Sequence, residues 1–120
     1  MRTEMLDNVL NELNSSSADV EASAIISTDG LVMAAQLPSS VDEDGVGAMS
    51  AAMLSLGDRT AQELSRGDLD QVLIKGGSGY VLMVRAGDDA VLTLMAKANA
   101  KLGLIFLDVK RAAKKISELI

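Results

Sequence analysis

Few side chains in this sequence could carry catalysis. The 120 residues include no Cys and no His, which excludes thiol nucleophiles, disulfides, thiolate metal sites and imidazole bases. The polar residues that could still act are mainly Asp, Glu, Ser, Thr, Lys and Arg, and none of them is spaced as a nucleophile with its base. We therefore expect no enzymatic activity, no catalytic residue and no bound cofactor.

Two short motifs bear a partial likeness to ligand-binding loops. The run GGSG at Gly76–Gly79 is rich in glycine, but a phosphate-binding loop also needs a Lys-Ser/Thr pair and a following helix. The run Asp42-Glu43-Asp44 is acidic, but a calcium loop needs further oxygen ligands at fixed spacing. A hairpin turn explains the first motif, and a helix N-terminus, where acidic residues complement the helix dipole, explains the second. We expect neither a phosphate site nor a metal site.

Two arginines, Arg59 and Arg85, could act on a partner rather than within the chain. An arginine inserted into the active site of a neighbouring nucleotide hydrolase stabilises the charge of the transition state. Glu63 follows Arg59 by four residues in a predicted helix, however, and this spacing favours an ion pair. The ion pair is the interpretation that we favour for Arg59.

Hydrophobic periodicity predicts three helices and five strands. Apolar residues recur at helical spacing near the N-terminus, at Met5, Leu6, Val9, Leu10 and Leu13. Asp29-Gly30 lies between two apolar runs and predicts a hairpin, because the tight turn needs positive φ. The predicted strands cover residues 20–27, 31–37, 71–75, 80–85 and 90–96, and the later helices cover residues 41–65 and the segment from Asn99, as N-cap, to the C-terminus.

The order α-β-β-α-β-β-β-α predicts an α/β sandwich, of the α+β type, built on one antiparallel sheet. The runs at residues 81–84 and 90–95 are apolar with hardly any alternation, so both faces of these strands must be covered. The long helix would cover one face and the two terminal helices the other. Gln71, Leu73 and Lys75 instead alternate with Val72 and Ile74, as in an edge strand. We expect residues 1–120 to form a single domain.

The long helix carries two neighbouring stripes. The stripe with larger side chains is assigned to the sheet, and it comprises Val46, Met49, Met53, Leu56 and Leu64. The stripe with smaller residues is assigned to a close helix–helix contact with a second copy of the chain, and it comprises Gly47, Ser50, Leu54, Gly57 and Ala61. Glycine within a helix costs about 1 kcal/mol relative to alanine, so its presence indicates close approach of another backbone. Tight packing inside the monomer is the alternative.

Charge is distributed unevenly along the chain. The segment from Lys97 to Ile120 carries six Lys or Arg and two acidic residues, whereas the first 96 residues carry five basic and fifteen acidic residues. The overall charge of −6 disfavours nucleic acid as a partner. The basic cluster Lys110, Arg111, Lys114 and Lys115 fits a solvated helix face or a membrane-surface helix. No segment is long enough to insert across a membrane, and we expect a soluble, cytoplasmic protein.

Three segments carry a family resemblance that extends over essentially the whole chain. They are STDGLVMAA at residues 27–35, MLSLGDRTAQEL at residues 53–64 and GYVLMVRAGDDAVLTLMAKANAKLGLIFLDVKRAAKKI at residues 79–116. In this order the chain resembles the Roadblock/dynein light chain superfamily. The resemblance implies a sheet of strand order 2-1-5-4-3 and a homodimer in which the third strands pair and the long helices lie together. It also implies regulation of a Ras-like small GTPase, without enzymatic residues.

The first functional hypothesis is therefore a non-enzymatic homodimeric regulator or scaffold of a Ras-like small GTPase. Its dimer interface would use the small stripe of the long helix together with Gln71, Leu73 and Lys75. The acidic run Asp42, Glu43 and Asp44 would steer the GTPase toward the long-helix side. The alternatives are a dimerisation platform for a signalling or transport complex without a GTPase, and a small-ligand sensor. The scarcity of aromatic residues, 2% of the chain, weakens the last alternative.

Overall fold

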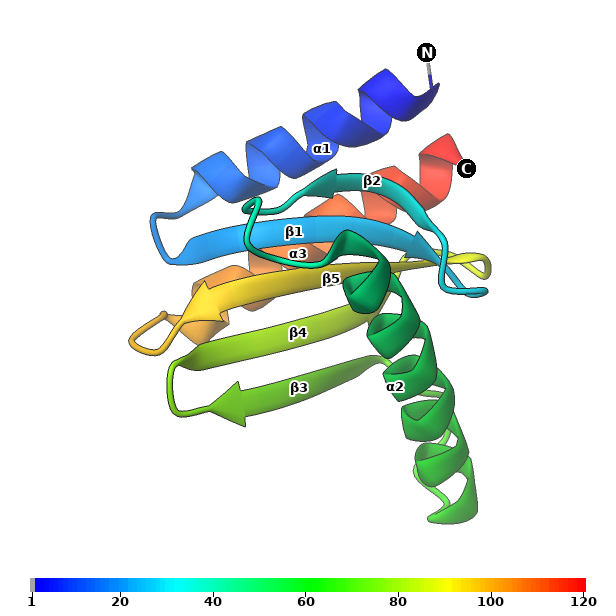
Figure 1. Ribbon diagram of the computed structural model, residues 1–120. Helices are drawn as coiled ribbons and strands as arrows, with labels where there is room; N and C mark the ends of the chain where they lie inside the picture. The colour runs from blue at the N-terminus through cyan, green and yellow to red at the C-terminus, as the bar shows by residue number, and fades with distance from the viewer. Residues whose placement is uncertain (1) are drawn as a thin grey trace.

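The computed structural model describes residues 2–120 and has the predicted order of three helices and five strands (Figure 1). The elements are α1 (Arg2–Ser16), β1 (Val20–Ser27), β2 (Val32–Gln36), α2 (Glu43–Glu63), β3 (Gln71–Gly76), β4 (Gly79–Arg85), β5 (Ala90–Lys97) and α3 (Leu102–Leu119). The prediction that Asn99 caps the last helix is wrong, because α3 has its N-cap at Lys101. A distant side chain helps to anchor this end instead, since Asp19 Oδ2 accepts a hydrogen bond from the Lys101 backbone N–H at 3.2 Å.

The five strands form one antiparallel sheet in the order β2-β1-β5-β4-β3, which confirms the expected topology. Strands β1 and β5 are central, and β2 and β3 are the two edges. The β1–β2 hairpin turns through Gly30, whose φ of +91° favours glycine. The GGSG motif is the predicted hairpin turn, because Gly76 pairs with Gly79 across the β3–β4 connection.

The helices cover the sheet as predicted, with α2 on one face and α1 and α3 side by side on the other (Figure 1). The larger core lies under α1 and α3, and its fully buried side chains include Leu10, Ile25, Leu92, Ile105 and Ile116. A smaller core, centred on Leu54, Met83 and Val91, lies between α2 and the sheet. The continuous apolar runs in β4 and β5 therefore follow from burial on both faces.

The cover is uneven across the width of the sheet. Six of the eight residues of β1 are buried, whereas five of the six residues of β3 are exposed. Helix α2 crosses the sheet obliquely and its C-terminal part extends beyond β3 (Figure 1). The edge at β3 is thus the part of the fold where backbone hydrogen-bonding groups and apolar side chains remain accessible to another molecule.

Candidate protein-binding surface

The small stripe of α2 packs on the sheet of its own chain. Gly47, Ser50 and Leu54 are the buried residues of this helix. A Cβ at position 47 would collide with the Gly30 carbonyl oxygen, and Ser50 Oγ lies 2.8 Å from Thr93 Oγ1 of β5 in a buried hydrogen bond. The assignment of this stripe to a contact with a second copy is therefore wrong for these three residues. Small side chains are needed here because α2 lies close to the β1–β2 turn and to β5.

The remainder of the small stripe also lies on the inner side of the helix. A Cβ at Gly57 would be 3.0 Å from side-chain carbons of Leu69 and of Val72 in β3. The absence of a side chain at Gly57 therefore lets β3 and the loop before it pack closely against α2. Ala61, one turn further on, is half-buried. The smaller residues thus allow close packing inside the monomer, which is the alternative that the sequence left open.

Most of the stripe of larger side chains points outward, opposite to its predicted placement, although Met53 packs against the smaller core as predicted. Met49, Leu56 and Leu64 are 61%, 57% and 64% exposed, and Val46 and Met53 are half-buried. The physical reason is steric, because an outward position accepts a bulky side chain that the narrow space above β5 does not.

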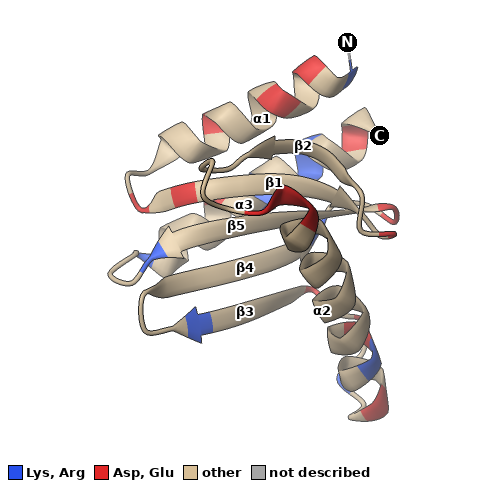
Figure 2. Ribbon diagram, in the orientation of Figure 1, with Lys and Arg blue, Asp and Glu red and all other residues tan. Residues whose placement is uncertain are grey.

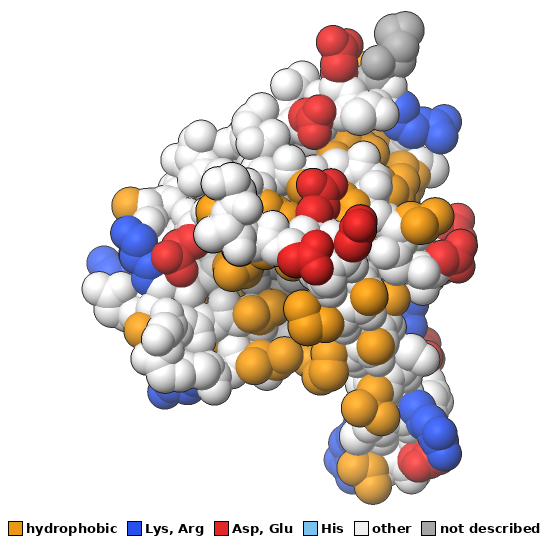
Figure 3. Space-filling view, viewed as in Figure 1, with side chains coloured by type: hydrophobic (Ala, Val, Ile, Leu, Met, Phe, Trp, Pro, Cys, Tyr) orange, Lys and Arg blue, Asp and Glu red, His pale blue; other side chains and the backbone are white. Residues whose placement is uncertain are grey.

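An apolar groove lies between this outward stripe and the uncovered half of the sheet. It has a volume of about 440 Å³. Its apolar walls come from α2 and the segment before it (Val41, Val46, Met49, Met53) and from the sheet (Ile74, Val81, Met83, Met95). Figure 3 shows the apolar side chains of this face gathered below the start of α2 and along the helix. A contiguous apolar surface of this kind is typical of a protein-binding site.

Strand β3 borders this groove with an open edge. It pairs with β4 alone, so the backbone groups along its outer side have no partner strand within residues 2–120. Ile74 lies on the α2 face with its pairing partner Val81, whereas Leu73 lies on the α3 face with Leu82. The edge character predicted for residues 71–75 is confirmed. Such an edge can add a strand from another chain.

The acidic run lies at the start of α2, beside the groove. Asp42 is the N-cap residue, and Glu43 and Asp44 occupy the first turn, as predicted for a helix N-terminus. All three side chains are exposed. Figure 2 shows acidic residues in red at the start of the α2 ribbon, and Figure 3 shows acidic side chains directly above the apolar ones on this face. A partner that reaches the groove would therefore meet negative charge at one end of it.

Both candidate arginines form ion pairs within the chain. Arg59 Nε lies 3.1 Å from Glu63 Oε1, which confirms the pairing expected from their spacing. Arg85 Nη2 lies 3.4 Å from Asp58 Oδ2 and so links β4 to α2. These contacts give both guanidinium groups a structural role in the isolated chain.

Within residues 2–120 no group of three or more acidic residues is arranged so that it could hold a metal ion. In the same part of the chain, no helix has the length and apolar character that spanning a bilayer requires.

Sequence reasoning missed most of the exposed apolar residues of this surface. It placed Met49, Leu56 and Leu64 against the sheet, although all three are exposed, and it gave no role to Ile74 or Met95. One signal was available: α2 carries more apolar surface than one sheet contact can bury. When two apolar stripes compete for one sheet face, the stripe with smaller residues allows the closer approach, and this rule would have assigned the large stripe to the outside.

Comparison with known proteins places this architecture among described domains. The sequence model of the Roadblock/LC7 domain family matches residues 5–96. An uncharacterised protein of Methanocaldococcus jannaschii is 44% identical over 115 residues, which cover 96% of this chain and 99% of that protein. The structure of Myxococcus xanthus MglB is similar with a TM-score of 0.89 at 15% identity, covering 98% of this chain and 92% of that chain. A Roadblock/LC7 domain from Streptomyces avermitilis has a TM-score of 0.88 at 20% identity, covering 93% and 94% of the two chains.

Proposed function

Because the chain belongs to the Roadblock/LC7 domain family, we propose that it is a cytoplasmic, non-enzymatic homodimer that regulates a Ras-like small GTPase. Domains of this family are generally regulatory and non-catalytic. The sequence offers no nucleophile–base pair, which agrees with this role. The observation that carries the proposal is the apolar groove beside the open edge of β3.

In the proposed dimer, β3 pairs with β3 of a second copy and continues the sheet. Gln71, Leu73 and Lys75 would then lie at the junction of the two sheets. The part of α2 that extends beyond β3 would reach over the second copy, so that Leu56 and Leu64 gain the cover that their own sheet does not provide (Figure 1). One MglB structure is described as a tetrameric arrangement, so self-association occurs on this fold.

The dimer would also form the surface that meets the GTPase. A two-fold contact uses the same patch on both copies, so the two acidic runs that begin the α2 helices would lie on one assembled face. Surface charge of one sign steers association and is weakened by salt. The acidic residues Asp42, Glu43 and Asp44 are proposed to guide the GTPase to this face.

The dimer is tested by light scattering on the purified chain. We expect twice the mass of the 12.5 kDa protomer for the wild type. Ile74→Glu should give the protomer mass, because an unpaired charge would be buried in the interface. Leu31→Glu is the matched control, since Leu31 is 69% exposed in the distant β1–β2 turn, and it should leave the dimer intact. A wild-type protein of protomer mass would refute the proposal.

The GTPase is tested by adding the wild-type chain or Ile74→Glu to a Ras-like GTPase from the same organism. We expect the wild type to change the rate of nucleotide exchange or GTP hydrolysis, and the monomeric variant to lose this effect. A dimer that neither binds such a GTPase nor changes either rate would favour the adaptor platform for a signalling or transport complex.

A further inference from the structure

A second groove lies on the opposite face of the sheet, between α3 and the strands β3 and β4. It has a volume of about 920 Å³ and so is larger than the groove beside α2. Its floor includes Leu82 and Val84 of β4, and its wall on the α3 side includes Phe106, Leu107 and Lys110. The proposed dimer reaches this groove only at its β3 border, through Gln71, and the proposed GTPase contact lies on the opposite face of the sheet.

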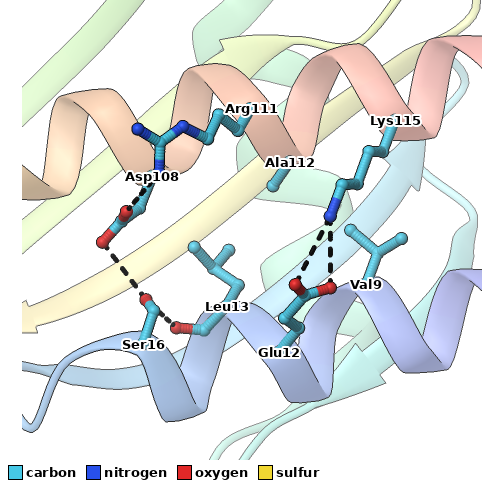
Figure 4. Close-up of a pocket in the computed structure, with 8 residues that line it drawn as sticks. All are labelled: Val9, Glu12, Leu13, Ser16, Asp108, Arg111, Ala112 and Lys115. Carbon is cyan, nitrogen blue, oxygen red and sulfur yellow. Dashed lines mark hydrogen bonds and ion pairs between the residues drawn. The ribbon is translucent and has the colours of Figure 1, made fainter.

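The two flanks of α3 differ in what covers them. On one flank α1 runs beside α3 and covers β1 and β2 (Figures 1 and 4). On the other flank, and on this face of the sheet, none of the helices described within residues 2–120 covers β3, which α2 contacts only from the opposite face (Figure 1). Leu107 and Leu73 remain 53% and 41% exposed on this side, and Val84 and Phe106 are only half-buried.

The occupied flank shows how this chain attaches a helix to α3. Helix α1 buries Val9 and Leu13 beneath it and directs Glu12 outward, where Glu12 Oε2 lies 3.2 Å from Lys115 Nζ (Figure 4). At the end of the same contact, Ser16 Oγ donates a hydrogen bond to Asp108 Oδ2 at 3.2 Å. Helix α1 thus packs its apolar stripe against α3 and uses the acidic and polar side chains along the border of that stripe to pair with groups on α3, among them the lysine Lys115.

The uncovered flank of α3 also carries lysines, but no helix of the described residues lies beside it to pair with them. Lys110 and Lys114 project along the groove wall, and within residues 2–120 neither of them has an ion-pair partner. Lys115 and Arg111, on the flank toward α1, both have one. Asp68 and Asp70 line the groove near the start of β3 and would repel an acidic group there. Acidic groups of a bound molecule would therefore be favoured only along the side that faces α3, where the lysines lie.

We infer that this groove binds an acidic amphipathic helix of a partner protein, in the way that α1 binds the other flank of α3. An α-helix is about 10 Å wide, and neighbouring strands lie about 4.8 Å apart, so one helix covers β3 and β4 as α1 covers β1 and β2. Its apolar stripe would contact Val84, Phe106 and Leu107, and its acidic residues would pair with Lys110 and Lys114.

The observations favour a partner helix over the other occupants. Helix α1 of a second copy is not available, because Leu6, Leu10 and Leu13 are buried in its own core. A lipid surface is flat, whereas the apolar floor lies within a groove that is bordered by Asp68 and Asp70 as well as by lysines.

The test is a titration of isotope-labelled protein with a designed helical peptide, followed by amide NMR shifts. The peptide has a leucine stripe and glutamates along one border, and a second peptide carries lysines in place of those glutamates. We expect shifts confined to α3, β3 and β4 with the first peptide. Lys110→Glu combined with Lys114→Glu should weaken its binding by about tenfold or more.

The matched control is Lys97→Glu combined with Lys101→Glu, which changes the net charge equally at exposed positions outside the groove lining. It should change the affinity by less than about twofold. Thermal unfolding of each variant shows whether the fold is retained, and Leu107→Asn tests the apolar contact without any change in charge.

Three outcomes would overturn the inference: no shifts in the groove, shifts on the α2 face instead, or equal binding of the lysine peptide. Sedimentation with vesicles of phosphatidylcholine and phosphatidylserine tests whether the groove binds anionic lipid instead of a helix. If the protein binds these vesicles and the Lys110→Glu, Lys114→Glu variant does not, the surface recognises anionic lipid and the partner helix is wrong.

Discussion

The two halves of the sheet differ in how completely the chain covers them. In the half made of β2, β1 and β5, α1 and α2 cover opposite faces and most of β1 is buried. In the half made of β4 and β3, apolar side chains on both faces lie in open grooves. We call these the closed half and the open half. The closed half contributes most of the core, and the open half offers an edge and two apolar faces to other molecules.

This difference gives one chain a buried core of its own although it also presents exposed apolar surface. The buried side chains of the larger core belong mainly to α1, α3 and the central strands. Met49, Leu56, Leu73 and Ile74 contribute little to that core because they are exposed. Substitutions should therefore affect stability in the closed half and association in the open half.

The largest effect is expected from removing a buried isoleucine in the closed half. Ile25 is 0% exposed and Ile74 is 39% exposed. Ile25→Ala should lower the free energy of unfolding by about 2–5 kcal/mol, because it leaves a cavity in the core. Ile74→Ala, measured on protein dilute enough to be monomeric, should change it by less than about 1 kcal/mol. Denaturant titrations of both variants give the values, and equal losses would contradict the division into two halves.

A smaller difference is expected between two glycines of α2. Gly47 lies against the Gly30 backbone in the closed half, whereas Gly57 lies against the side chains of Leu69 and Val72 at the open half. Gly47→Ala should destabilise the protein by about 1–3 kcal/mol, because a backbone carbonyl cannot move aside alone.

Gly57→Ala is the matched control for that substitution. Flexible side chains can shift by a few tenths of an ångström, and the gain in helix propensity of about 1 kcal/mol offsets the crowding. Thermal unfolding of both variants checks the prediction. If Gly57→Ala were the more destabilising of the two, the close contact of α2 would lie at β3 rather than at the β1–β2 turn.

The sequence predicts the elements and the edge strand well because both depend on local patterns. The alternation of Gln71, Leu73 and Lys75 with Val72 and Ile74 is a local property, and it identified the edge. The strand order came from the family resemblance and is confirmed by the pairing of β1 with β5. In contrast, the orientation of α2 depends on which stripe fits the space above β5, and hydrophobic periodicity does not contain that information.

The candidate surface was only partly predictable for the same reason. The acidic run was correctly placed at a helix N-terminus, because its composition matches the helix dipole. The groove arises from residues as distant as Met49, Ile74 and Met95, and no local pattern brings them together. The open flank of α3 is visible only when the position of α1 is known.

A modest effect is expected from the buried hydrogen bond that fixes α2 over the closed half. Ser50→Ala should cost about 1–2 kcal/mol of unfolding free energy, because the Thr93 hydroxyl is left buried without its partner. The double variant Ser50→Ala, Thr93→Val should lose less than the sum of the two single variants. Additive losses in this double-mutant cycle would show that the two hydroxyl groups do not depend on each other.

The smallest effect is expected from the acidic run, which lies beside the open surface and contributes nothing to the core. Replacing Asp42, Glu43 and Asp44 by Asn, Gln and Asn should leave the dimer mass and the unfolding temperature nearly unchanged, since all three residues are exposed. If these charges steer a GTPase, the association rate constant of the triple variant at low salt should be about three- to tenfold lower than that of the wild type, with little change in the dissociation rate constant. The difference from the wild type should also shrink as salt is added.

Stopped-flow measurements over a range of salt concentrations provide both rate constants. An unchanged association rate constant, together with a loss of binding in the Lys110→Glu, Lys114→Glu variant, would show that the GTPase binds the α3 face and not the α2 face.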